Sequence, residues 1–246
     1  MTPAWHCQIC GAGEPRHLVT QRDFVWVECP GCGFICLEPM PSFEAARAIQ
    51  DAASGEAFIR DYTVKRRSKM RRSMGRVRRL KRRMRGRRLL DVGANVGFLV
   101  EAARRQGLEA VGLEINPVLV DHASATLPGN RFICGTMEEA GLAAESFDCV
   151  YTSEVIEHLV DVNSFIAEIA RVSRPGGLLY LTTPEIEHYK TGPDPLTWRW
   201  LNAPNHKLYF NRDNIRALLD RHGFGIERFF NNRWGKPGIK LLARRA

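Results

Sequence analysis

Four cysteines early in the chain form two pairs, each with two residues between its members. The pairs are Cys7–Cys10 and Cys29–Cys32. Each pair can present two thiolates from a tight turn, and four thiolates complete the tetrahedron that Zn²⁺ prefers. Because about 40 residues cannot bury a sufficient core, metal binding would supply the folding free energy. A redox-active pair, the alternative, lacks its usual fold context. We therefore expect one structural zinc ion.

A second group of residues lies where an apolar strand turns into a helix, within residues 89–98. Its members are Asp91, Gly93, Asn95 and Gly97. Glycine lets the backbone approach a ligand closely, and ligands of open α/β sheets bind at the carboxyl ends of the strands. Glu114 closes the next strand, 23 residues after Asp91, where a carboxylate can accept hydrogen bonds from ribose hydroxyls. The glycine loop alone is equally consistent with a nicotinamide cofactor or a purely structural turn.

Glu157 and His158 follow a later apolar strand. His158 can act as a general base, and Glu157 can orient or polarise its ring. Alternatively, His158 caps a helix end and never meets a substrate. A second alternative is a site for Mg²⁺ or Mn²⁺, formed by these two residues with Glu154 and a fourth ligand from His206.

Strand–helix alternation is the pattern that must position these groups. Strands are expected at 88–92, 110–114, 131–134, 149–153 and 178–183, and helices at 43–53, 98–106, 118–126, 164–172 and 212–222. Short apolar strands alternating with helices predict a parallel, doubly wound α/β sheet covered by helices on both faces. Two final strands, near 225–230 and 239–243, should form a hairpin.

Four further motifs follow this alternation at ordered separations. They are Gly135–Glu138, Ser146–Val150, Ser153–Leu159 and Arg174–Leu178. With the glycine loop, they resemble the class I S-adenosylmethionine-dependent methyltransferases, especially the ubiquinone-type O-methyltransferases, over residues 60–246. The resemblance implies a Rossmann-like sheet and binding of S-adenosylmethionine.

The resemblance also implies a role for each candidate residue. Asp91, Gly93, Asn95 and Gly97 would line the methionine and ribose end, Glu114 would hold the ribose, Thr136 and Met137 would flank the adenine, and Ser153 would lie beneath the sulfonium. Asn95 replaces the family's usual middle glycine. Since asparagine tolerates left-handed backbone conformations, the loop should still work.

Two other resemblances concern the Glu-His pair and the cysteines. The pair at Glu157 and His158, like the four-cysteine module, is similar to that of nucleotide-sugar C-methyltransferases, where it removes a proton. Glu154, Glu157 and His158 also match the metal-binding pattern of small-RNA 3′-end methyltransferases. The chain should thus comprise a zinc-ribbon-like module (1–40), a linker with a basic amphipathic helix (41–88) and a methyltransferase domain (89–246).

The net charge of +9 comes from one segment. Residues 65–88 contain 15 lysines and arginines and no acid, while the remaining cations are fewer than the chain's 27 acids. Methionine, valine and leucine recur there near the helical period, so an apolar stripe should lie on the main domain and the basic faces should look outward. Those faces could bind nucleic acid, another anionic substrate or a membrane surface, or could simply be solvated.

A composition of 44% hydrophobic and 26% charged residues is typical of a globular protein. The start has no signal-peptide pattern, and no apolar stretch reaches the roughly 18–20 residues of a membrane span, so we expect a cytoplasmic location. The expected function is methylation of oxygen, carbon or nitrogen on a small acceptor, anionic or nucleotide-linked. The alternatives are an RNA methyltransferase that uses the basic helix and a non-catalytic cofactor-binding protein.

Overall fold

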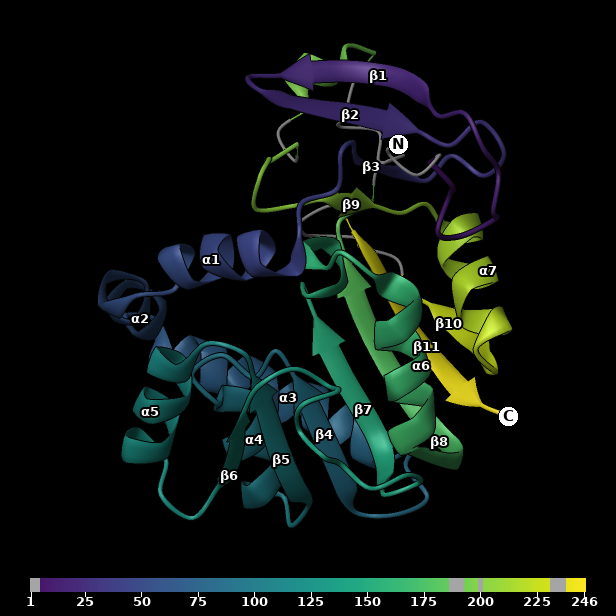
Figure 1. Ribbon diagram of the computed structural model, residues 1–246. Helices are drawn as coiled ribbons and strands as arrows, with labels where there is room; N and C mark the ends of the chain where they lie inside the picture. Colours follow the sequence, from purple (N-terminus) through teal and green to yellow (C-terminus); the bar gives the residue numbers. More distant parts are fainter. Residues whose placement is uncertain (1–4, 186–192, 199–200, 231–237) are drawn as a thin grey trace.

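The computed structural model describes the chain except for residues 1–4, 186–192, 199–200 and 231–237. Two sheets organise the described part: a large sheet at the bottom of Figure 1 and a small one above it. Helices cover the large sheet.

The large sheet has seven strands in the order β10-β11-β8-β7-β4-β5-β6. The strands are β4 (Arg88–Val92), β5 (Glu109–Glu114), β6 (Arg131–Cys134), β7 (Phe147–Ser153), β8 (Ser173–Thr183), β10 (Phe224–Phe229) and β11 (Ile239–Arg245). The first five are parallel, and β11 lies antiparallel between β8 and β10. From β4 the chain runs outward through β5 and β6, then returns to β7 on the other side. The strand order therefore reverses at the carboxyl end of β4, where ligands of such sheets bind.

Each face of the large sheet has its own apolar core, because successive side chains of a strand alternate between faces. Leu89, Leu178 and Leu242 pack with residues of α3 (Arg66–Lys81) and α4 (Phe98–Arg105). Leu90, Leu179 and Leu241 pack with residues of α6 (Val162–Val172) and α7 (Arg212–Arg221). The predicted doubly wound sheet is confirmed.

Most helices begin at side-chain caps that satisfy otherwise unpaired amides. Ser42 caps α1 (Phe43–Ala53), Asn116 caps α5 (Pro117–Thr126), Asp161 caps α6 and Asn211 caps α7. Between α1 and α3 lies α2 (Glu56–Thr63), which the sequence pattern did not predict. Its N-cap is Gly55, which offers no side chain to mark a helix start.

The small sheet has the order β1-β2-β3-β9. Its strands are β1 (Arg16–Gln21), β2 (Phe24–Glu28), β3 (Ile35–Leu37) and β9 (Leu208–Tyr209). The ring of Tyr209 lies 5.3 Å from that of buried Trp26, and Trp198 packs against the same cluster. The aromatic residues of segment 185–210 could have covered a substrate, but Trp198 and Tyr209 pack in this apolar cluster instead.

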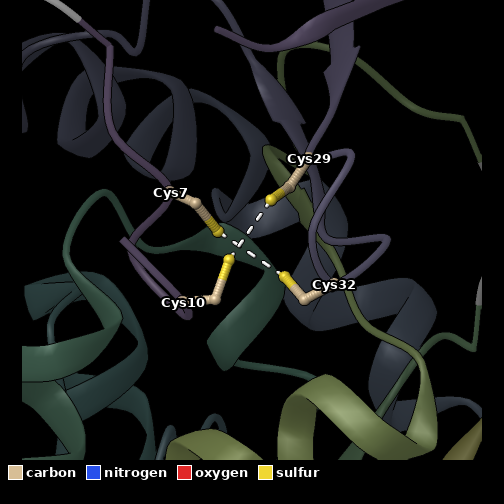
Figure 2. A group of neighbouring side chains, drawn as sticks. All are labelled: Cys7, Cys10, Cys29 and Cys32. Atoms are coloured by element: carbon tan, nitrogen blue, oxygen red, sulfur yellow. Dashed lines mark hydrogen bonds between the residues drawn. The ribbon is translucent and has the colours of Figure 1, made fainter. Parts of the chain in front are cut away.

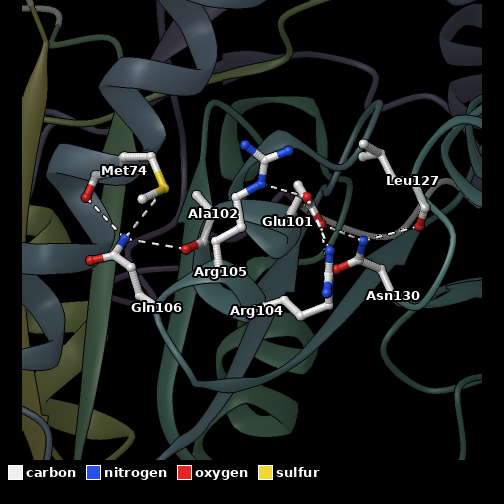
Figure 3. A network of polar contacts seen from close by, with 8 residues as sticks. All are labelled: Met74, Glu101, Ala102, Arg104, Arg105, Gln106, Leu127 and Asn130. Atoms are coloured by element: carbon white, nitrogen blue, oxygen red, sulfur yellow. Dashed lines mark hydrogen bonds and ion pairs between the residues drawn. The ribbon is translucent and has the colours of Figure 1, made fainter.

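Helix α3 is held on α4 by apolar contacts and by Gln106 (Figure 3). Val77 and Leu80 are buried there, and the Gln106 amide donates to the carbonyl oxygen of Met74 at 3.1 Å. On α4, Glu101 accepts hydrogen bonds from three side chains, those of Arg104, Arg105 and Asn130. Although burial raises the pKa of Glu101, these bonds lower it to about 2. The predicted apolar stripe of the basic helix is confirmed.

Two cysteines outside the early pairs lie in strands of the large sheet. Cys149 on β7 is buried, whereas Cys134 is exposed at the end of β6.

Within the described part of the chain, no helix has the length and apolarity needed to cross a membrane.

Candidate functional site

A cavity of about 1050 Å³ opens at the carboxyl end of β4. Loops after β4, β5, β6 and β7 form its floor, and α1, α2 and α3 supply the opposite wall. Eight predicted site residues line it: Asp91, Gly93, Asn95, Glu114, Thr136, Met137, Ser153 and His158. Gly97 and Glu157 do not. The structure thus brings together residues spread over more than 60 positions of sequence.

The glycine loop is pinned to β5 by its own backbone. The amides of Gly93 and Ala94 donate to the carbonyl oxygen of Leu113 at 2.9 and 3.0 Å. Asn95 has a φ of +52°, the left-handed conformation that its residue type allows. Gly93 has a φ of +77°, and a Cβ there would lie 2.4 Å from the side chain of Val155. The loop therefore needs glycine at 93 but accommodates asparagine at 95.

Gly97, at the start of α4, serves packing. Its φ is +79°, and a Cβ there would lie 2.4 Å from the ring of Phe132 on β6. Its assignment to the ligand end stays a prediction that the cavity lining does not support.

Replacing Gly97 by alanine is expected to lower the free energy of unfolding by about 2–4 kcal/mol, from backbone strain plus the collision with Phe132. Urea denaturation measures the loss. Gly129→Ala is the matched control, because Gly129 has a φ of +83° but open space around its Cβ. Equal losses in the two variants would contradict the packing role.

Glu114 is held rigidly at the edge of the cavity. Its carboxylate accepts the amide hydrogens of Asn95 at 2.8 Å and Asn116 at 3.2 Å. Burial raises its pKa, while these amides oppose the rise. A carboxylate has about four acceptor positions, so these bonds leave further positions open. The open positions could accept hydrogen bonds from the two hydroxyls of a diol.

Asp91 is the most buried acid of the cavity, with 3% of its surface exposed. Burial, followed by the charge of Glu114, raises its pKa to about 8, against the opposing effect of Arg76. A cationic ligand group beside Asp91 would restore the ionised form, because an opposite charge favours it.

His158 faces the cavity with one ring nitrogen fixed. Its Nδ1 donates to the carbonyl oxygen of Asn205 at 2.8 Å, which leaves Nε2 with a free lone pair. Burial, opposed by this hydrogen bond, lowers the pKa of His158 to about 4. The ring is therefore neutral at physiological pH.

Glu157 lies beneath the cavity and is completely buried. Its Oε2 accepts from the hydroxyl of Thr183 at 3.0 Å, and its Oε1 is buried with no hydrogen-bond partner among the residues that the structure describes. Burial and then the charge of Glu154 raise its pKa to about 8. The backbone of Asn205, which sequence reasoning missed, rather than the side chain of Glu157, fixes the ring of His158.

A possible metal group includes His206. The ligand atoms of Glu157, His158 and His206 all lie within 4.8 Å of one another. Glu154 does not belong to this group, and its Oε1 accepts from the hydroxyl of Thr182 at 2.8 Å. The ligand set proposed from sequence thus loses Glu154 and keeps His206.

Comparison with known proteins agrees with this geometry. A family model described as a methyltransferase domain matches residues 62–228, more than half of the chain. The chain belongs to the class I S-adenosylmethionine-dependent methyltransferases. It is 32% identical over 150 residues to a probable S-adenosylmethionine-dependent methyltransferase of Mycolicibacterium smegmatis, covering 61% of this chain and 56% of that protein. It is 34% identical over 131 residues to a ubiquinone biosynthesis O-methyltransferase of Rhizobium rhizogenes, covering 52% of this chain and 50% of the other.

The chain thus spans about half the length of the curated relatives it matches. Among solved structures, a methyltransferase from Archaeoglobus fulgidus superposes with a TM-score of 0.61 at 17% identity, covering 78% of this chain and all of the other. Magnesium protoporphyrin IX methyltransferase of Synechocystis, with bound S-adenosylmethionine, gives 0.60 at 17% identity, covering 82% and 97%. These two structures support the fold alone.

The basic helix α3 contributes cationic side chains to the cavity, which the sequence analysis did not predict. Lys69, Arg72 and Arg76 of α3 line the cavity. Arg76 donates to the hydroxyl of Tyr151 at 2.9 Å, and the ammonium of Lys69 lies over the ring of Tyr62. The expectation that the basic faces all look outward is therefore wrong. Their helical spacing, three and four residues apart, is the signal that could have placed them on one face.

The side chains of the four cysteines point toward one another (Figure 2), and none of them lines the cavity. Their sulfur atoms lie within 4.8 Å of one another, with Cys7–Cys32 at 3.6 Å and Cys10–Cys29 at 3.4 Å. Burial raises the pKa of Cys7 to about 11. Bound zinc would favour the thiolates instead.

The two cysteine turns are built alike. The amides of Gly11 and Gly33 donate to the carbonyl oxygens of Cys7 and Cys29, both at 2.9 Å. Both glycines have positive φ values, +75° and +69°. Sequence reasoning overlooked a glycine directly after each pair. Two equivalent turns with four converging sulfurs fit a tetrahedral zinc ion.

Proposed function

We propose that the chain transfers the methyl group of S-adenosylmethionine to a small, negatively charged acceptor. The observation that carries this is the cavity at the carboxyl end of β4, with Glu114 fixed by backbone amides on one side and three cations of α3 on the other. At about 1050 Å³ it lies at the upper end of the range of ligand pockets, roughly 300–1,000 Å³. This size supports a site that holds donor and acceptor together.

The cofactor position follows from the residues around the cavity. Glu114 would accept both ribose hydroxyls, with Thr136 and Met137 against the adenine and Ser153 beneath the sulfonium. Asp91 would bind the ammonium of the methionine moiety, since its raised pKa would fall beside a cation. When bound, the cofactor supplies an activated methyl group on a positively charged sulfur.

His158 would serve as the base for an acceptor hydroxyl. Its Nε2 would take the proton of that hydroxyl as the oxygen received the methyl group that S-adenosylmethionine would supply. The relatives named as O-methyltransferases support oxygen as the methylated atom. Glu157, which is completely buried next to His158, would help to position the segment that carries the histidine ring.

The inward cations favour a small anionic acceptor over RNA. Lys69, Arg72 and Arg76 line the cavity and can contact an anionic group that enters it, whereas a nucleic acid would use the exposed arginines elsewhere between 65 and 88. Salt-dependent RNA binding would favour the nucleic-acid alternative. Cofactor binding without methylation of a broad metabolite panel would favour a non-catalytic protein.

The two candidate metal sites have different roles in the proposal. The four cysteines would hold one structural zinc ion. The group of Glu157, His158 and His206 would bind Mg²⁺ or Mn²⁺ only in competition with proton transfer at His158, because both need its Nε2. Turnover that requires added Mg²⁺ or Mn²⁺ would favour the metal alternative. A cytoplasmic location stays a prediction.

Replacing Glu114 by alanine is expected to weaken binding of S-adenosylhomocysteine at least tenfold, since a hydrogen bond to a charged group contributes about 1.5–3 kcal/mol. Titration calorimetry measures this. Glu109→Ala is the control, because Glu109 begins the same strand, is largely exposed and pairs with Arg88. An unchanged dissociation constant for Glu114→Ala would refute the ribose assignment, and no affinity in the native protein would refute the proposed function.

A further inference from the structure

Gln8 lies inside the first cysteine turn, between Cys7 and Cys10, and its side chain points toward the segment before α6. Its Nε2 donates to the carbonyl oxygen of Val160 at 2.8 Å, and its Oε1 accepts the amide hydrogen of Val162 at 3.0 Å. A single amide side chain therefore holds the backbone of another segment at two points, 152 and 154 residues along the chain.

The backbone of Gln8 strengthens the same contact. Its carbonyl oxygen accepts from the side chain of Asn163 at 2.9 Å and from Arg221 at 3.1 Å. Asn163 is in the first turn of α6, whose N-cap is Asp161. The cysteine turn thus contacts both the start of α6 and the loop before it.

That loop is a wall of the cavity. His158, Leu159, Val160 and Asp161 all line it. The position of His158, proposed as the base, therefore depends on a loop whose far end is bound to the first cysteine turn.

A second set of hydrogen bonds connects strand β3, through Lys207, to the segment that carries His158. The amide of Leu37 on β3 donates to the carbonyl oxygen of Lys207 at 3.0 Å, and the amide of Lys207 donates to Glu157 at 2.8 Å. The buried ammonium of Lys207 donates to the carbonyl oxygen of His158 at 3.0 Å. The first cysteine turn and strand β3 thus contact the segment that carries His158 at two separate places.

We propose that Gln8 is a positioning residue, and that the zinc-bound cysteine turn fixes the loop 158–161 through it. The direction of the Gln8 side chain is set by the turn that Cys7 and Cys10 close. A metal that joins this turn to Cys29 and Cys32 therefore fixes the loop as well. Loss of the ion would release the loop and change the cavity without altering a residue of its floor. This role rests on the proposed function for its consequence in catalysis, but not for its structural part.

The test compares Gln8→Ala with Gln21→Ala. Gln21 ends β1 of the small sheet, and its side chain also donates to a distant carbonyl, that of Leu201, which does not line the cavity. Hydrogen–deuterium exchange is measured on the ligand-free full chain, on the peptide containing Val162, together with zinc content. The native protein is measured with and without chelator.

The expected result is exchange about five- to tenfold faster around Val162 in Gln8→Ala, with native zinc content, because one hydrogen bond of that amide is lost. Gln21→Ala should exchange there at the native rate. Chelation should accelerate this peptide in the native protein and have less additional effect in Gln8→Ala. Native exchange around Val162 in Gln8→Ala, or in the chelated native protein, would overturn the proposal.

A separate readout keeps this proposal distinct from the proposed function. Binding of S-adenosylhomocysteine to the native protein is measured alongside. No binding in the native protein, with the exchange pattern as expected, would remove the proposed function and leave the structural role of Gln8 standing. Binding with an unchanged exchange pattern would do the reverse.

Discussion

Replacing His158 by alanine is expected to lower turnover by about 10²–10⁴-fold, the usual contribution of a general base. The affinity for S-adenosylhomocysteine should stay within about twofold, because the ring is held at the acceptor side by Asn205 and binds no cofactor atom in the proposed arrangement. Single-turnover kinetics and titration calorimetry separate the two quantities. His17→Ala, an exposed histidine on β1, is the control. Equal turnover in His158→Ala and His17→Ala would remove His158 as the base.

The pH profile follows from the lowered pKa of the same residue. With a pKa of about 4, His158 stays neutral from pH 8 down to about 5, so turnover should not fall on its account in that range. Below that, protonation removes the base. The folded state binds fewer protons than the unfolded state between about pH 4 and pH 6.5, so His158 makes folding less stable as pH falls through this window. A loss of activity centred near pH 6.5 would contradict the burial of this ring.

Replacing Cys29 by serine is expected to abolish stoichiometric zinc and to unfold the small sheet. Structural zinc binding is worth about 10–16 kcal/mol in zinc-finger peptides, so the loss should exceed that of any single side-chain contact in this region. Elemental analysis should find one zinc per native chain. Thermal denaturation should show a midpoint lower by roughly 10–20 °C in the variant, which corresponds to about 5 kcal/mol.

Cys134→Ser is the control for this variant, since Cys134 is exposed and far in sequence from the four ligands. It should keep both zinc and the native midpoint. Protein purified without chelators that contains no zinc would contradict the assignment, as would full zinc content in Cys29→Ser.

Much of the fold could be predicted because local signals coincide with it. Strands β5 and β7 end in Glu114 and Ser153, and Asp91 is the next-to-last residue of β4, as periodicity indicates. Helix α1 begins after its N-cap Ser42, as capping indicates. The cofactor end of the cavity follows from the same motifs, since it is formed by strand ends and their loops. Asn95 adopts the predicted left-handed conformation.

The remainder depends on contacts between distant segments, which periodicity cannot reveal. Strand β9 has two residues, too few for alternation, and becomes a strand only by pairing with β3. The fixed ring of His158 depends on the backbone of Asn205, whose position no side-chain pattern encodes. Helical spacing could have placed Lys69, Arg72 and Arg76 together on the face that lines the cavity. Their positive charge instead favoured the interpretation that this face is exposed to solvent. Gln8 has no sequence signal at all.

The pairing of β3 with β9 has a consequence for how this chain can be exchanged with relatives. If residues 1–40 alone were grafted onto a relative, Trp26 would pack against whatever residue the relative has in place of Tyr209. Strand β3 would also have to pair with a segment that did not evolve with it. A functional chimera would need the stretch around Leu201–Phe210 from the same parent. Natural variation in the two segments should therefore be correlated, even though more than 160 residues separate them.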